Sequence, residues 1–245
     1  MSDAVAVAPR AARTAFGAPA RRSRIGWTAV MLTSLMIAGI SLSTYASASL
    51  RALADDGAGL AGTYVGAPLP VRLAFYVHVA LASLALLLGP WQFSHRLRRR
   101  WPVAHRSVGV AYLLTVGIAS VCALVMAPFN HARMAGFFGF GALALLWAYT
   151  AWRGFDTARR RDLRQHQAWM IRNYAFTFAA VTLRSWVGLL IAVQLPFVAP
   201  DADPAALFET AYVAVPFLCW VPNVIVAEWL IRRRGLPSYR LVDPA

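Results

Sequence analysis

The sequence contains no lysine, and only ten acidic residues stand against its 24 arginines. Charged residues make up 14% of the chain and hydrophobic residues 59%. Soluble domains contain about 25% charged and about 45–50% apolar residues, so this composition excludes a soluble enzyme. The two cysteines, Cys122 and Cys219, lack the close spacing of a metal or redox pair and are too few for a disulfide scaffold.

Several catalytic motifs are also missing. The sequence has no HExxH, no GxSxG and no Walker-type loop, which argues against a metalloprotease, a serine hydrolase and an ATP-driven transporter. We also expect no acidic residue at membrane depth, because Glu209 and Glu228 bound the last apolar run at its two ends. A proton-coupled transporter would normally place a titrating carboxylate there.

Long apolar runs dominate what is present. A run of 18 or more apolar residues can cross the ~30 Å hydrocarbon core of a bilayer as a helix. The sequence therefore predicts an all-α, polytopic integral membrane protein with one six-helix membrane domain over residues 25–232, between a disordered cytoplasmic arm (1–24) and a cytoplasmic tail (233–245). The expected spans are 26–48, 73–93, 107–128, 135–152, 173–195 and 210–231.

The first span has a rival interpretation as a signal peptide, because Ala46-Ser47-Ala48 resembles a small-residue cleavage site. Signal-peptide cores are about 7–15 residues long, whereas this apolar stretch is longer than a single core. An uncleaved membrane anchor is therefore favoured.

The arginines are distributed very unevenly. Twenty of the 24 lie in four segments that alternate with the others, namely residues 10–24, 95–106, 153–172 and 232–240. The positive-inside rule then predicts a multi-pass protein of the bacterial inner membrane with both termini in the cytoplasm. Arginine clusters beside a bilayer bind anionic lipid headgroups, so we expect membrane lipid rather than nucleic acid as the partner. A monomer and a homo-oligomer both fit the sequence.

A pattern recurs in the two central arginine segments. Arg98–Arg100 is followed five residues later by His105, and Arg159–Arg161 is followed five residues later by His166. Both copies lie between an inward-running and an outward-running span. Spans 2–3 and 4–5 could therefore be a parallel repeat of two helical hairpins, although chance matches between arginine triplets explain the pattern equally well.

Arg184 is the most unusual residue, because it lies near the middle of the fifth span. A guanidinium at that depth costs at least ~2.5–3.5 kcal/mol and requires a partner. The partner could be a backbone carbonyl, an anionic or carbonyl-bearing ligand, or a hydroxyl of the first span, which offers Thr33, Ser34, Ser41 and Thr44. If the helix begins near Leu163, a polar stripe runs from His166 to Arg184 and should point into the bundle.

The histidines favour a cofactor hypothesis. Facing imidazoles in a helical bundle are typical axial ligands of b-type haem, so His105 and His166 are the candidate iron ligands. His78 interrupts an apolar span and, with Arg184, belongs to a second cofactor-binding site. The best hypothesis is therefore binding of haem b or a quinone for electron transfer. A small-solute transporter or sensor with a cavity lined by histidine and arginine, and a ligand-free structural or assembly protein, remain open alternatives. His95 and His131 are interpreted as solvated loop residues.

The central part of the chain, about residues 78–184, resembles the bacterial membrane-protein family DUF2306. The motifs that carry the resemblance are His78, Gly89-Pro90-Trp91-Gln92-Phe93, His105-Arg106 with Gly109 and Tyr112, His166, Trp169-Met170-Ile171-Arg172, and the run from Ala175 to Arg184. The resemblance implies a membrane protein and brings no activity with it.

The topology can be tested with reporter fusions. Fusions after Arg100, Arg161 and Ala245 should report the cytoplasm, and fusions near Gly59 and Asp203 should report the outside, because the arginine-rich segments stay inside. A cytoplasmic signal at Asp203 would contradict the six-span topology.

Overall fold

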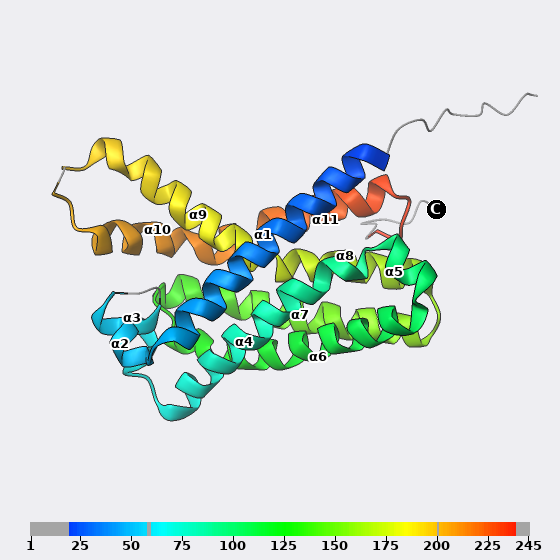
Figure 1. Ribbon diagram of the computed structural model, residues 1–245. Coiled ribbons are helices and arrows are strands. Elements are labelled where there is room, and N and C mark those ends of the chain that lie inside the picture. Colours follow the sequence, from blue (N-terminus) through cyan, green and yellow to red (C-terminus); the bar gives the residue numbers. More distant parts are fainter. Residues whose placement is uncertain (1–19, 58–59, 200, 239–245) are drawn as a thin grey trace, which may run out of the picture.

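The computed structural model describes residues 20–57, 60–199 and 201–238, and within these ranges every regular element is a helix (Figure 1). Six segments are long and apolar enough to cross a membrane, which confirms the all-α fold with six spans. They are Ile25–Ser47, Leu69–Gln92, Pro102–Phe129, Arg133–Arg159, Leu163–Phe197 and Pro204–Arg233.

Four spans are each built on one long helix, and two are each built from two helices. The single helices are α1 (Ala20–Ser47), α4 (Leu69–Gln92), α6 (Pro102–Met126) and α7 (Arg133–Arg159). The fifth span contains α8 (Leu163–Thr177) and α9 (Ala179–Gln194), and the sixth contains α10 (Pro204–Leu218) and α11 (Val221–Arg233). The short elements are α2 (Leu50–Asp55), α3 (Ala61–Val65), α5 (His95–Arg100), η1 (Ala127–Phe129) and η2 (Leu195–Phe197).

Several helices extend beyond the charge-free runs. Helix α1 begins at Ala20, so residues 20–24, which we expected in the disordered arm, are helical; residues 1–19 lie outside the described residues. Arginine is a good helix former, so charge ends the apolar run without ending the helix. Helix α8 begins at Leu163 as expected, and the Asp162 side chain caps it by accepting from the Gln165 N–H at 3.1 Å.

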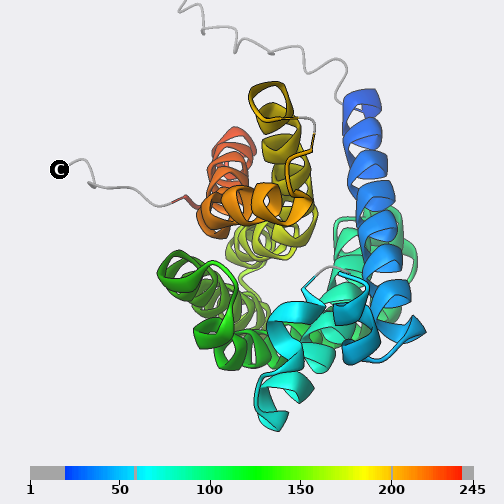
Figure 2. The same ribbon diagram turned by 90° about the vertical axis from the view of Figure 1, so that its left-hand side faces the viewer.

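The bundle core lies between α4, α6, α7 and α8. Its centre is a cluster that includes Ala85, Tyr112, Val116 and Ala119, each of which has no exposed surface. The first and sixth spans pack outside this core. Helix α1 of the first span lies along α4, and α11 of the sixth lies along α8 (Figure 2). A four-helix core flanked by the first and last spans is the arrangement that the hairpin pattern predicts. The repeat itself stays a prediction.

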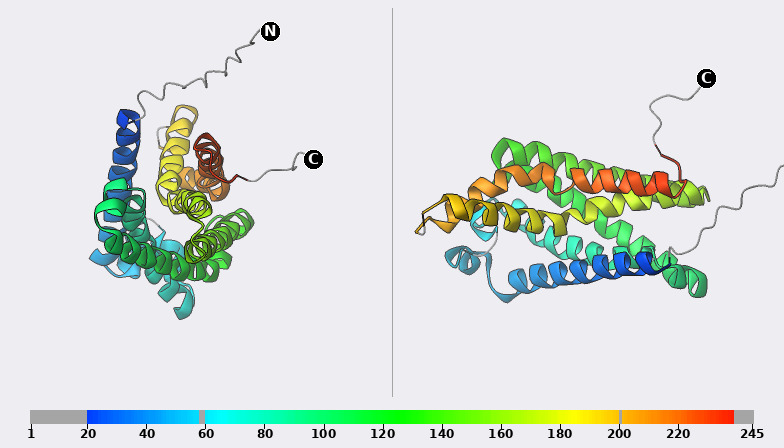
Figure 3. Two further views of the ribbon diagram at one scale, coloured as in Figure 1. Left: turned by 90° about the vertical axis from the view of Figure 1, so that its right-hand side faces the viewer. Right: turned by 90° about the horizontal axis from the view of Figure 1, so that it is seen from above.

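The two ends of the bundle differ in composition. Figures 1 and 3 show α5, the α7–α8 turn and the end of α11 at one end, and α2, α3 and the α9–α10 turn at the other. The three arginine triplets of the chain lie in the first group of segments. The protein is therefore a multi-pass membrane protein with one arginine-rich end, and the cytoplasmic location of that end stays a prediction.

Close helix packing depends on Gly89 of α4. A Cβ atom added at Gly89 would lie 2.2 Å from Cε2 of Tyr174, because the tyrosine ring of α8 lies directly on the α4 backbone. The Tyr174 hydroxyl is 2.9 Å from Oγ of Ser34 and so links α8 to α1. Gly89 thus allows three helices to meet.

Replacing Gly89 by alanine should destabilise the bundle by about 1–3 kcal/mol, because the Tyr174 ring must move and its hydrogen bond to Ser34 is strained. Gly117→Ala on α6 is the matched control, since a Cβ there meets nothing within 4 Å. Thermal unfolding in detergent measures both. Equal melting temperatures for the two variants would contradict this packing role.

Candidate ligand cavity at two helix breaks

The fifth span is interrupted at Phe178, between α8 and α9. The Thr177 hydroxyl donates to the Asn173 carbonyl oxygen at 3.2 Å, a local bond of the kind that bends helices. Phe178 remains near the helical region, with φ −68° and ψ −11°, and the Val181 N–H turns to the Phe178 oxygen at 2.9 Å. The chain therefore restarts as α9 in a new direction.

The sixth span is also interrupted, at Cys219 and Trp220, between α10 and α11. Trp220 has φ −128° and ψ −30°, outside the helical range. Pro222, in the first turn of α11, has no N–H group and its ring would clash with a carbonyl four residues earlier. Helix α10 consequently ends at Leu218.

Two polar side chains satisfy the carbonyl groups at these breaks. Asn223 Nδ2 donates toward the Ala175 oxygen at 3.2 Å and toward the Cys219 oxygen at 3.0 Å, and it is 3.0 Å from Thr182 Oγ1. The Thr182 hydroxyl donates to the same Cys219 oxygen at 2.5 Å. Irregular backbone at membrane depth is tolerated only where it is buried in protein or lines a cavity. Both breaks meet this condition, because each is buried against the other and side chains from one bond to carbonyl oxygens of the other.

A cavity of about 200 Å³ lies beside the breaks. Its walls come from the ends of α1 and α3, from α4, α6 and α7, and from the residues around both breaks. The lining is Tyr45, Leu60, Tyr64, Phe75, His78, Val79, Ala82, Ala123, Met126, Ala127, Asn130, Phe140, Leu143, Ala144, Trp147, Phe176, Thr177, Ala179, Ala180, Leu183, Arg184, Tyr212 and Cys219. His78 and Arg184, two of the four site residues predicted from the sequence, therefore line the same space.

His78 is held in one tautomer. Its Nδ1 lies 2.9 Å from the Ala119 carbonyl oxygen, which can only accept, so Nδ1 carries the proton and Nε2 is left as an acceptor. The ring packs edge-on against Trp147, with centroids 6.4 Å apart. The Trp147 indole N–H is itself satisfied, since it donates to Thr177 Oγ1 at 2.9 Å.

Arg184 lines the cavity but does not lie wholly inside the bundle, where a continuous polar stripe would have placed it. The break at Phe178 redirects α9, so Arg184 is exposed on the protein surface beside α1. Its guanidinium donates to the Ala180 oxygen at 2.8 Å and to Ser41 Oγ at 2.7 Å. A hydroxyl of the first span is thus one of its partners. The remaining guanidinium N–H groups make no hydrogen bond within the described part of the chain.

A polar cluster in which each group is hydrogen-bonded lies behind Trp147 and Thr177, two residues of the cavity lining. The Tyr112 hydroxyl donates to Asn173 Oδ1 at 2.6 Å, and Asn173 Nδ2 donates to the Trp147 oxygen and to Thr150 Oγ1, each at 2.9 Å. Asn173 and Tyr112 have no exposed surface. Buried networks of this kind fix side-chain positions when every group is paired.

Three tyrosines from the opposite end complete the lining: Tyr45, Tyr64 and Tyr212. Tyr64, in α3, lies outside the spans, and its burial, followed by its proximity to Tyr45, raises its pKa to about 12. Its hydroxyl therefore stays protonated at neutral pH and can act as a hydrogen-bond donor. Asn130 Oδ1 also belongs to this region and has no partner among the described residues, although it is buried.

The other two predicted site residues lie elsewhere. His105 and His166 begin α6 and α8 toward the arginine-rich end, and neither lines the cavity. His166 Nδ1 is 2.8 Å from the Gly154 carbonyl oxygen of α7, so its Nε2 is the free ring nitrogen. His105 Nδ1 is buried without a partner within the described ranges. The four predicted residues thus separate into two pairs.

The remaining histidines behave differently from each other. His95 is exposed; partial burial and then Arg98, Arg99 and Arg234 lower its pKa, and its Nδ1 is 2.9 Å from the Arg98 guanidinium. This is the environment expected for a loop histidine. His131 instead lies 3.7 Å from a Glu209 carboxylate oxygen and packs against Phe208 and Tyr212, so it joins the turn after η1 to α10.

An ion pair joins the fifth and sixth spans and includes an acidic residue, Glu228, within the sixth span, where none was expected. Arg172 Nε and a terminal nitrogen donate to the two carboxylate oxygens of Glu228 at 2.5 and 3.0 Å, and the arginine side chain is only 5% exposed. The arginine count placed Arg172 in a cytoplasmic loop. Helix α8 begins at Leu163, however, so Arg172 is carried into the bundle against α11.

Sequence reasoning also missed Asn223 and Thr182, which hold the two breaks together. The available signal was the Pro222-Asn223 pair inside an apolar run, because a proline in mid-span frees a carbonyl and an adjacent amide can satisfy it. Thr182 gave no comparable signal, since a threonine in an apolar helix usually bonds to its own backbone.

These features define a helical, multi-pass membrane protein with two interrupted spans beside an intramembrane cavity. The family described as "Predicted membrane protein (DUF2306)" matches residues 75–231, and the chain belongs to this family. The match confirms the resemblance seen in the sequence and extends it through both helices of the sixth span. Neither the curated proteins nor the solved structures contain a match to the chain.

Proposed function

We propose that the protein binds the ring of a lipid-soluble, quinone-type molecule in the cavity beside the helix breaks. The observation that carries the proposal is the joint presence of His78 and Arg184 in one cavity of a membrane-spanning bundle. His78 offers Nε2 as a hydrogen-bond acceptor, and Arg184 offers unused N–H donors. Discontinuous helices at membrane depth are a common setting for ligand sites.

The chemistry of a quinone ring matches this pair of groups. A quinone carbonyl oxygen accepts hydrogen bonds, which suits the free N–H groups of Arg184. The hydroxyl of the reduced form donates, which suits Nε2 of His78. Aromatic walls formed by Phe75, Tyr64 and Trp147 fit a flat ring. The pair therefore serves either redox form of the ring.

The size of the cavity limits what it can hold. Pockets for drug-sized ligands measure about 300–1,000 Å³, so about 200 Å³ suits a single substituted ring. A porphyrin macrocycle consists of four pyrrole rings joined by methine bridges and is too large for this volume. A haem in this protein would have to use the other histidine pair.

The position of Arg184 favours a ligand that enters from the bilayer. Arg184 lines the cavity and is also exposed beside α1, where its bond to Ser41 is a contact between the first and fifth spans. In a membrane this surface faces lipid rather than water. A molecule dissolved in the bilayer reaches it directly, whereas a small aqueous solute does not.

Binding of a decyl-substituted benzoquinone to detergent-purified protein, measured by titration calorimetry, tests the proposal. Arg184→Leu should weaken binding about 10- to 100-fold, since hydrogen bonds to charged groups contribute about 1.5–3 kcal/mol. Arg184→Lys should rescue poorly, because an ammonium cannot replace the planar fork of donors. His78→Ala should weaken quinol binding, and His131→Ala is the matched control. Unchanged affinity in both Arg184→Leu and His78→Ala would refute the site.

A b-type haem is the second candidate, and it concerns the other end of the bundle. It is favoured by the bond from His166 Nδ1 to the Gly154 oxygen, since axial histidines commonly use Nδ1 in this way and leave Nε2 for iron. His105 would supply the facing imidazole from α6. Electrons would then pass between a haem held by His105 and His166 and a quinone bound beside His78 and Arg184.

The visible absorption spectrum of the purified protein, oxidised and then reduced with dithionite, tests the haem. A reduced α-band should be present and should disappear in both His105→Ala and His166→Ala, because one remaining imidazole leaves the iron five-coordinate. His95→Ala should leave the band unchanged. A protein that stays colourless after haem is added would reject this candidate without affecting the quinone proposal.

A further inference from the structure

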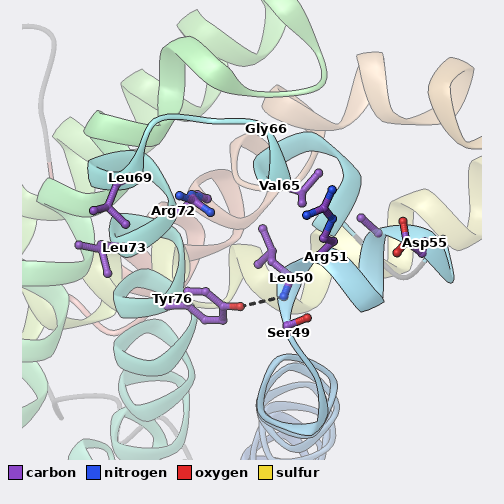
Figure 4. Close-up of a pocket in the computed structure, with 11 residues that line it drawn as sticks. Ser49, Leu50, Arg51, Asp55, Val65, Gly66, Leu69, Arg72, Leu73 and Tyr76 are labelled. Carbon is purple, nitrogen blue, oxygen red and sulfur yellow. Dashed lines mark hydrogen bonds between the residues drawn. The ribbon is translucent and has the colours of Figure 1, made fainter.

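A second cavity lies at the end of the bundle away from the arginine triplets. It measures about 690 Å³ and lies between α2, α3 and the first turns of α4 (Figure 4). A hydrogen bond from the Leu50 N–H to the Tyr76 hydroxyl, at 3.1 Å, fastens α2 to α4 beneath it. Its lining is Ser49, Leu50, Arg51, Ala54, Asp55, Val65, Gly66, Leu69, Arg72, Leu73 and Tyr76.

Two arginines face this cavity from different helices. Figure 4 shows Arg51 of α2 and Arg72 of α4 on opposite sides, with Asp55 beyond Arg51 and away from Arg72. Neither guanidinium makes a hydrogen bond or ion pair within the described ranges of the chain. Outside the four arginine-rich segments the chain has only four arginines, so two of them meet here.

The depth of the cavity places these charges beside lipid headgroups. The first apolar span ends at Ser47, four residues before Arg51, and the second begins at Leu69, three residues before Arg72. Both cations therefore lie within about one helical turn of a span boundary. This is the level of the phosphate groups in a bilayer.

The α4 wall of the cavity is amphipathic. Leu69, Arg72, Leu73 and Tyr76 are spaced i, i+3, i+4 and i+7, so they share one helix face. Leu69 and Leu73 are 58% and 55% exposed. Leu69 is the first residue of the span, and Leu73 lies on the membrane side of Arg72. A ligand that covers this face needs an anionic head and an apolar chain.

We propose that Arg51 and Arg72 bind a phosphate group in this cavity, and that the ligand is an anionic phospholipid whose acyl chain lies along Leu73, on the membrane side of Arg72. Guanidinium groups bind phosphate through paired N–H donors, and two of them across one cavity exceed the single charge of Asp55. The proposal is independent of the quinone site, which has a separate lining.

The test compares lipid binding to the full-length protein in nanodiscs. Native mass spectrometry should show retention of phosphatidylglycerol over phosphatidylcholine, and Arg51→Gln and Arg72→Gln should each reduce retention about 10-fold, in line with loss of a charge-assisted bond. Arg133→Gln is the matched control, because Arg133 is another arginine outside the clusters and does not line the cavity. Arg72→Lys keeps the charge and should retain part of the binding if a glutamine variant misfolds.

A thermal-shift titration with inorganic phosphate identifies the source of the phosphate group. No stabilisation by phosphate together with selective lipid retention supports the phospholipid. Stabilisation by phosphate that both glutamine variants lose, with no lipid preference, keeps the anion site but overturns the lipid. Equal retention of both lipids without a phosphate effect, or an equal loss in Arg133→Gln, overturns the whole proposal.

Discussion

The structure depends on one constraint, which is that every backbone carbonyl at membrane depth needs a donor when no water is present. A continuous helix is the simplest way to meet this constraint, but two spans are interrupted, at Phe178 and at Cys219–Trp220. Asn223 and Thr182 satisfy the constraint by reaching across from one break to the other. Because each break supplies donors for the other, neither helix can be straightened alone. The two breaks form a single structural unit.

The position of the cavity follows from this unit. Helix α9 follows the first break and α10 precedes the second, and neither continues the line of its partner helix. The space beside His78 is therefore closed by short segments and side chains instead of a full helix. The first break also carries Arg184 to the edge of α1, where Ser41 and the Ala180 carbonyl hold only part of its guanidinium. A cation in a bilayer with donors left over favours a ligand with acceptor oxygens. The proposed quinone site is thus a consequence of how the spans are interrupted.

Much of the fold could be predicted from local patterns. Apolar runs gave the six spans, and the distribution of arginines separated the two ends. The break at Phe178 was not predictable, because Thr177 and Phe178 are ordinary residues for an apolar helix. The nearby Ala175 carbonyl and Thr182 hydroxyl are bonded by Asn223, which belongs to another span. For the same reason the exposure of Arg184 at the protein surface was not expected. Glu228 was missed because its partner, Arg172, looked like a loop arginine.

Photoaffinity labelling with an azido-quinone in native membranes tests the central claim most directly. The claim predicts that the label attaches to peptides that line the cavity, from the segments around His78, Trp147 and Arg184, and that excess unlabelled quinone prevents it. Labelling confined to lipid-facing residues of α1 or α6, without competition, would contradict it.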